Sequence, residues 1–135
     1  MLFGAATSIG GTNPAIWSTY LYDNQHSSYN PSATAITPAV VPTLTQLWKF
    51  HPPGAKDHPP NRLYASPTVV GNAVYIGSNS GLFFKLNRLT GQIVWKVDLG
   101  FSPKATIKGG GRCRAKGILA TAAVAPDPVT GRQMV

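Results

Sequence analysis

Nucleophilic chemistry in this 135-residue chain would depend on Cys113, its single cysteine. The thiol lies in a basic run, Arg112-Cys113-Arg114-Ala115-Lys116, and neighbouring cations favour the reactive thiolate where such a side chain is exposed. A lone cysteine excludes an internal disulfide. An unpaired loop thiol without any role explains the residue equally well, so Cys113 keeps two interpretations.

Carboxylates and imidazoles, the other reactive groups, are few and scattered. A Ca²⁺ site needs several oxygen ligands, and a zinc site needs His or Cys ligands at short spacing. The chain has no Glu, and its acids and imidazoles show neither pattern: Asp23, Asp57, Asp98, Asp127, His26, His51 and His58. The sequence therefore predicts no metal site, and Asp23 is expected to fix its own loop by hydrogen bonds.

The formal net charge of +8 reflects scarce acids rather than abundant bases. Charged residues make up 12% of the chain, against about 25% in an average soluble domain. The densest basic group, residues 104–116, has only Phe101 beside it, whereas nucleic-acid binding favours a basic face with interleaved aromatics. We expect no nucleic-acid partner and no membrane span, since no run approaches the ~20 apolar residues that a span needs.

Residues 65–99 predict a compact piece of β structure. Four short apolar runs, at 68–70, 73–77, 82–86 and 92–97, are separated by three turn signals rich in Asn and Gly. This is the pattern of a four-stranded antiparallel meander. Apolar residues occur on both faces, so the sheet must stack against similar sheets, as in a repeat architecture.

The segments around the meander are less regular. Residues 1–16 are expected to be a flexible lead, 17–43 an irregular arm with aromatic anchors, and 51–63 and 100–116 loops. Residues 44–50 and 117–125 are predicted strands, with a turn at 126–131 and another strand from 132. Trp48 and Trp95 end similar motifs 47 residues apart, and Ala65 and Ala120 begin similar ones 55 apart. Repeats of roughly 40–50 residues are typical of β-propeller blades, although coincidence is the alternative.

The series at 66–95, from Ser-Pro-Thr-Val-Val to Thr-Gly-Gln-Ile-Val-Trp, resembles the pyrroloquinoline quinone (PQQ) repeat. The N-terminal frame of Trp17, Asp23, Tyr29-Asn30-Pro31, Ile36-Thr37-Pro38 and Leu47-Trp48 resembles quinoprotein alcohol dehydrogenases, most closely the polyvinyl-alcohol-dehydrogenase type. The resemblance covers residues 17–135. It implies an all-β fragment of an eight-bladed propeller, in which 17–43 is an arm, 44–50 closes the last blade, 65–99 is one complete blade, and 117–135 begins the next.

The resemblance also implies a chemistry. Such enzymes oxidise alcohols with PQQ and Ca²⁺, pass electrons to an acceptor such as cytochrome c, and are periplasmic or secreted. Their metal ligands and catalytic Asp come from later blades, so this N-terminal portion is expected to be inactive alone. Three positions match cofactor contacts: Tyr64, where a carboxylate is usual; Cys113, where a Cys pair is usual; and Lys116, where Arg is usual. Lys offers charge but no bidentate fork.

Two alternatives remain open. The missing Cys pair and Tyr64 would also suit a non-catalytic, PQQ-like scaffold that binds proteins, similar to the lipoprotein of outer-membrane protein assembly. The second alternative is that this short chain makes no folded product, because its blade faces would be left exposed. The two tryptophans, Trp48 and Trp95, are predicted to pack between blades rather than to contact a ligand.

Overall fold

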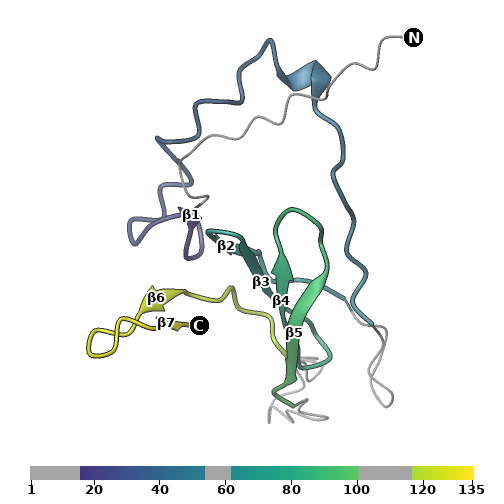
Figure 1. The fold of residues 1–135 in the computed structure, drawn as a ribbon, viewed down its shortest axis with the longest axis vertical. Coiled ribbons are helices and arrows are strands. Elements are labelled where there is room, and N and C mark those ends of the chain that lie inside the picture. The colour runs from purple at the N-terminus through teal and green to yellow at the C-terminus, as the bar shows by residue number, and fades with distance from the viewer. Residues whose placement is uncertain (1–15, 54–61, 101–116) are drawn as a thin grey trace, which may run out of the picture.

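A computed structural model of the chain describes residues 16–53, 62–100 and 117–135, and this part is built of β-strands (Figure 1). Five strands form one antiparallel sheet in the order β1-β2-β3-β4-β5, and two more form a separate hairpin. The strands are β1 Ile16–Trp17, β2 Thr68–Val70, β3 Ala73–Gly77, β4 Leu82–Asn87, β5 Ile93–Asp98, β6 Ala125–Pro126 and β7 Gln133–Met134. The only helical element among these residues is a 3₁₀ turn, η1 Val41–Thr43.

Strands β2 to β5 confirm the predicted meander nearly residue for residue. Each pairs antiparallel with the next along the chain. The turns follow local chemistry: Gly71 takes a φ of 57° in the two-residue β2–β3 turn, a conformation that glycine adopts freely. Alternating Val, Tyr, Ile and Phe side chains then leave both faces of the sheet apolar.

The first strand is a departure from the sequence prediction. Ile16 and Trp17 were expected to end a flexible lead and begin an irregular arm, but they pair with Val70 and Val69 and extend the sheet. Strand β2 has no other neighbour on that side, so its free N–H and C=O groups accept a short apolar segment as a ladder partner. The rest of the predicted lead, residues 1–15, lies outside the described residues.

Two predicted strands are not formed as expected. Residues 44–50 join no ladder in the described part of the chain, and of 117–125 only Ala125 belongs to a strand. Both segments instead pack on faces of the main sheet, one through Trp48 and Phe50 and the other through Ile118, Ala122 and Val124. Both segments therefore have the residue composition of strands, but apart from Ala125 they do not form the hydrogen-bonded ladder that defines a strand.

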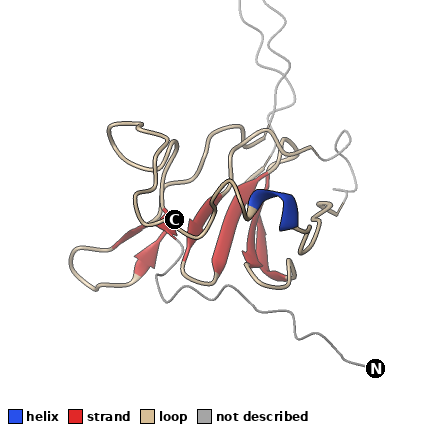
Figure 2. Cartoon of the chain, turned by 90° about the horizontal axis from the view of Figure 1, so that it is seen from above, coloured by secondary structure: helices blue, strands red, loops and turns tan. Residues whose placement is uncertain are grey.

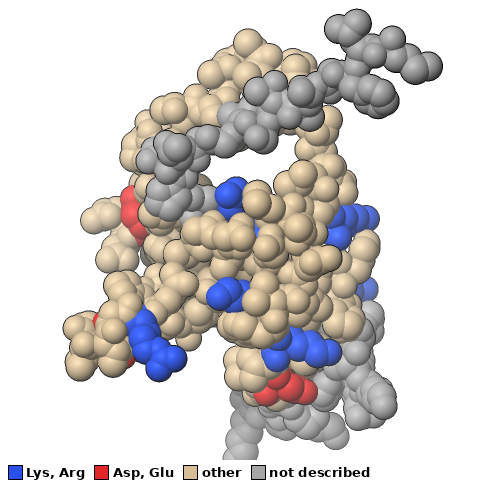
Figure 3. Space-filling view, in the orientation of Figure 1, with Lys and Arg blue, Asp and Glu red and all other residues tan. Residues whose placement is uncertain are grey.

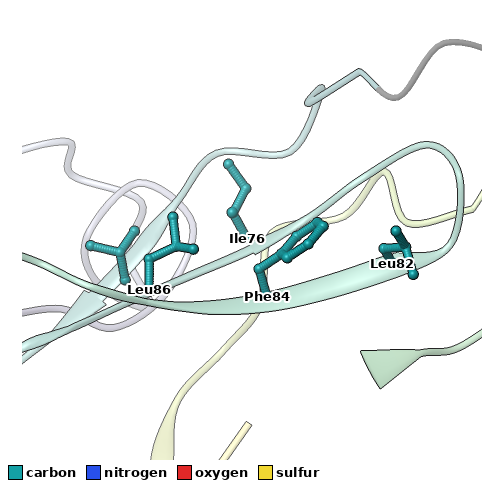
Figure 4. Packing of buried hydrophobic residues seen from close by; sticks show 5 residues of the cluster. Ile76, Leu82, Phe84 and Leu86 are labelled. Atoms are coloured by element: carbon teal, nitrogen blue, oxygen red, sulfur yellow. The ribbon is translucent and has the colours of Figure 1, made fainter. Parts of the chain in front are cut away.

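The main sheet has an apolar core on each face. One core consists of Val74, Ile76, Leu82, Phe84 and Leu86 and is covered by Trp48, Phe50 and Leu63 (Figure 4). The other consists of Ala73, Tyr75, Phe83 and Val124, with Ile118 and Ala122 packed against it. Figure 2 shows the strands of the sheet from above, with the 3₁₀ turn and long loops beside them. The two-sided burial confirms that this sheet requires a partner layer on each face.

The outer strand β5 remains open. All six of its residues are exposed, and Trp95 is 38% exposed even though its ring contacts Tyr75 and Phe83. These ring contacts lie within the sheet that contains Trp95, so the packing of Trp95 between blades stays a prediction.

Trp48 shows how a segment docks on the sheet. Its indole N–H donates a 2.8 Å hydrogen bond to the carbonyl of Arg88, in the β4–β5 turn. The ring lies over Gly91, where a Cβ would come within 2.7 Å of the ring atom Cδ2. A side chain at Gly91 would therefore displace the indole, which explains why glycine occupies this turn.

Replacing Trp48 by Phe tests the indole hydrogen bond. Phe keeps an aromatic ring over Gly91 but leaves the carbonyl of Arg88 without this donor, so we expect a loss of about 1–2 kcal/mol in unfolding free energy. Urea denaturation followed by circular dichroism measures it. Trp95→Phe, on the exposed strand, is the matched control and should cost clearly less; equal losses would contradict the docking interpretation.

A second turn repeats the conformation of the β4–β5 turn. In residues 87–92, Asn87 Oδ1 accepts from the N–H groups of Leu89 and Thr90, and Gly91 N donates to Asn87 O over 2.8 Å. Residues 127–132 make the same bonds: Asp127 Oδ1 accepts from Val129 and Thr130, and Gly131 N donates to Asp127 O over 2.8 Å. The N–H groups of Thr130 and Val129 lower the pKa of the Asp127 carboxyl.

Candidate functional site

A pocket of about 570 Å³ opens where the chain approaches β2. Three segments far apart in sequence line it: Tyr20 from the arm, residues 64–66 before β2, and residues 119–121. A smaller, mostly apolar pocket of about 320 Å³ shares Ser66 with it and is otherwise lined by Trp17, Leu21, Pro67 and Val69. The first pocket is the candidate site because it contains Tyr64, the one predicted cofactor contact among the described residues.

The β3–β4 turn fixes two of the three segments. Asn79 exchanges hydrogen bonds with the backbone of Arg62: its Oδ1 accepts from Arg62 N over 2.8 Å, and its own N–H donates to Arg62 O over 2.9 Å. Asn79 O also accepts from Gly117 N over 2.9 Å. Thr68 Oγ1 donates to Ala122 O over 2.5 Å. One buried asparagine thus ties together the stretches that lead to Tyr64 and to Leu119.

The arm is attached to the same framework. Val124 N donates to Ser18 O over 2.8 Å, and Trp17 lies edge-on to Tyr22 at 5.4 Å between ring centroids. Asp23 closes the loop, since its carboxylate accepts from Ser27 N over 2.9 Å and from Ser27 Oγ over 2.6 Å. These bonds from Ser27 lower the pKa of the Asp23 carboxyl. The expectation that Asp23 fixes its own loop is therefore confirmed.

The side chains of the pocket suit a flat, polar ligand. Tyr20 and Tyr64, which both line the pocket, are about half exposed, at 48% and 53%. Ser66 and Thr121 add hydroxyl groups to the lining. Arg62 Nη1 lies 3.5 Å from the Tyr64 hydroxyl, which brings a positive charge next to that lining residue. Aromatic rings, hydroxyls and one guanidinium can stack on and hydrogen-bond to a planar anion.

Acid–base and metal chemistry are not provided by the described residues of this pocket. None of its lining side chains is a carboxylate or an imidazole. Across residues 16–53, 62–100 and 117–135, no three His, Cys, Asp or Glu side chains gather in a way that could hold a metal ion.

The other predicted site residues cannot be placed. Cys113 and Lys116 lie outside the described residues, as does residue 57, so their predicted roles stay predictions. Tyr20, by contrast, lines the pocket without having been singled out as a site residue. The sequence holds one relevant signal, the group of aromatic residues in the arm, but nothing local indicates which of them reaches the pocket.

The charged side chains do not form a binding surface for nucleic acid on the face shown in Figure 3. Lys and Arg appear as separate patches across this face and at its edges rather than as one stripe. Lys85, for example, lies over the Tyr75 ring at 5.7 Å from its centroid and is used in packing. A search of the described residues for a helix long and apolar enough to cross a membrane finds none.

Comparisons with known proteins extend the description. Residues 17–133 match the family described as glucose/ethanol/alcohol dehydrogenase, beta-propeller domain. A polyvinylalcohol dehydrogenase from Pseudomonas sp is 27% identical over 104 residues. The match covers 77% of this chain but only 15% of that relative. No solved structure matches the chain.

Proposed function

Because the chain belongs to the β-propeller domain family of glucose, ethanol and alcohol dehydrogenases, we propose that it forms one wall of a PQQ site in an enzyme that oxidises alcohols. The observation that carries the proposal is the pocket of about 570 Å³ lined by Tyr64, the residue that the family resemblance matches to a cofactor contact. The matched relative's name adds a polymeric alcohol as a substrate class.

The described residues fit part of the cofactor. PQQ is a flat aromatic tricarboxylate, and the tyrosine rings with Arg62 offer stacking and one positive charge. Tyr64 would donate its phenolic hydrogen to a carboxylate or carbonyl oxygen, and Arg62 would hold that hydroxyl in place. When bound, PQQ supplies the acceptor for the hydride of the alcohol. The described residues do not fit Ca²⁺, so metal binding, the catalytic base and delivery of electrons to a cytochrome belong to other parts of the proposed enzyme.

The test is isothermal titration calorimetry of the 135-residue chain with PQQ. We expect saturable binding, weakened about fivefold or more by Tyr64→Leu, which removes both the ring and the hydroxyl. Tyr29→Leu is the matched control, because Tyr29 is 67% exposed and lies outside the pocket. Absence of saturable binding, or equal affinities for the two variants, would refute the PQQ site. A periplasmic or secreted location is part of the same proposal and is tested by fractionating the native host.

One observation favours a second candidate, the protein-binding scaffold. The pocket lining has a tyrosine where the family usually has a carboxylate, and β5 presents apolar side chains to solvent. A scaffold would show a stable protein partner in a pull-down from the native host, together with no heat of PQQ binding. Both results are needed, because a partner alone is also compatible with a dehydrogenase.

A further inference from the structure

We propose that residues 18–29 of the arm are part of the ligand site, and that Tyr20 is a second aromatic contact for the planar ligand that Tyr64 binds. This inference rests on the proposed function for the identity of the ligand. The observation behind it is separate: Tyr20 lines the same pocket as Tyr64, although the two residues are 44 positions apart in the sequence. This part of the arm therefore has a binding role.

The position of Tyr20 is set by contacts on either side of it. Before it, Trp17 pairs with Val69 in the β1–β2 ladder, and Ser18 O accepts the 2.8 Å bond from Val124 N. After it, Leu21 enters the smaller pocket beside Ser66, and His26 lies edge-on to the Tyr20 ring at 5.8 Å between centroids. Because both sides are attached, the ring is held at the pocket rather than left on a free loop.

The backbone of the arm is unusual in the same stretch. Leu21, Tyr22, His26 and Ser28 all have positive φ, between 54° and 81°, which side chains other than glycine rarely adopt. Each such residue costs about 1–2 kcal/mol relative to ordinary backbone. The Asp23–Ser27 bonds and the Trp17–Tyr22 contact help to keep this conformation. Strained backbone of this kind is common where a binding group must be presented in a fixed place.

The chemistry of the pocket selects the class of ligand. Two tyrosine rings favour a flat conjugated molecule, because aromatic pairs gain stacking energy beyond the area they bury. The hydroxyls of Ser66 and Thr121 and the guanidinium of Arg62 favour oxygen substituents and negative charge on it. A volume of about 570 Å³ lies within the range of ordinary small-molecule sites, about 300–1,000 Å³. The ligand class is therefore a planar aromatic anion, for which PQQ is the probe.

Two measurements with PQQ test the role of Tyr20. In calorimetry, Tyr20→Leu should weaken PQQ binding about fivefold to tenfold, while Tyr20→Phe, which keeps the ring, should stay within about twofold of the unmodified chain. In nitration by tetranitromethane, read by peptide mass spectrometry, saturating PQQ should slow modification of Tyr20 about fivefold. Tyr29, which lies in the same arm and outside the pocket, should react at an unchanged rate and serves as the internal control.

The outcomes separate this inference from the proposed function. If the unmodified chain binds PQQ but nitration of Tyr20 is unprotected, or Tyr20→Leu binds as tightly as Tyr20→Phe, Tyr20 is no contact and the PQQ site of Tyr64 stands. If the unmodified chain does not bind PQQ, both fall together. Thermal unfolding of each variant shows that a loss of binding does not arise from a loss of the fold.

Discussion

Replacing Phe84 by Ala should lower the unfolding free energy by about 3–5 kcal/mol, the largest effect expected of any side-chain truncation in the described core. Phe84 has no exposed surface, and its ring meets that of Phe50 edge-on at 5.2 Å between centroids (Figure 4). Truncation removes that contact and leaves a cavity between β4 and the segment of Trp48 and Phe50. Urea denaturation followed by far-ultraviolet circular dichroism measures the loss.

Two further variants make the Phe84 result specific. Phe84→Leu keeps most of the buried volume and should cost about 1–1.5 kcal/mol. Leu47→Ala removes a side chain that is 73% exposed, and should change stability by no more than about 0.5 kcal/mol. A similar loss in Phe84→Ala and Leu47→Ala would mean that this face of the sheet is not a packed core.

Gly81→Ala should be the most damaging glycine substitution among the described turns, with an expected cost of about 3 kcal/mol or more. Gly81 has a φ of 87°, and a Cβ there would overlap the carbonyl of Gly100, whose carbon atom would lie only 2.6 Å away. The position is crowded because Gly81 also accepts from Leu99 N and lies against Gly117. Removing this overlap would require a shift of the backbone, which costs more free energy than a rotation of a flexible side chain.

Gly71→Ala separates the backbone strain of a positive φ from the steric overlap with Gly100. Gly71 also has positive φ, 57°, but a Cβ there would meet nothing within 4 Å. Its substitution should cost only the backbone strain, about 1–2 kcal/mol. Thermal or urea unfolding of both variants gives the difference, which measures the overlap at Gly100. If Gly71→Ala were the more damaging of the two, the close approach of Gly81 to Gly100 would be wrong.

The fold could be predicted where it depends on local chemistry. The β2–β5 meander follows from alternating Val, Tyr and Phe and from Asn/Gly turns, all of which act within a few residues. Residues 44–50 and 117–125 have the same composition, yet they mostly cover sheet faces, because a ladder also needs a partner edge. Strand β1 was missed for the converse reason: its partner β2 is some 50 residues away.

The site was harder to predict than the sheet. Tyr64 was identified through a family resemblance and lies in the largest pocket described here, but no local pattern marks it. Tyr20 was not identified, because its place depends on the bond between Ser18 and Val124, which joins distant parts of the chain. Long-range hydrogen bonds of this kind, including those of Asn79, carry no periodic signal in the sequence.

The two matching turns, at 87–92 and 127–132, affect where the boundaries of a sequence repeat should be placed in such chains. They are offset by 40 residues, but one joins β4 to β5 and the other joins β6 to β7. Strands β6 and β7 form a separate hairpin, which the 3.1 Å bond from Tyr75 OH to Gln133 Oε1 ties to the main sheet without joining its ladder. A chain engineered by duplicating a 40-residue unit would therefore join strands that occupy different places in the sheet. The Thr-Gly turn therefore marks a connector and not a fixed position within a repeat.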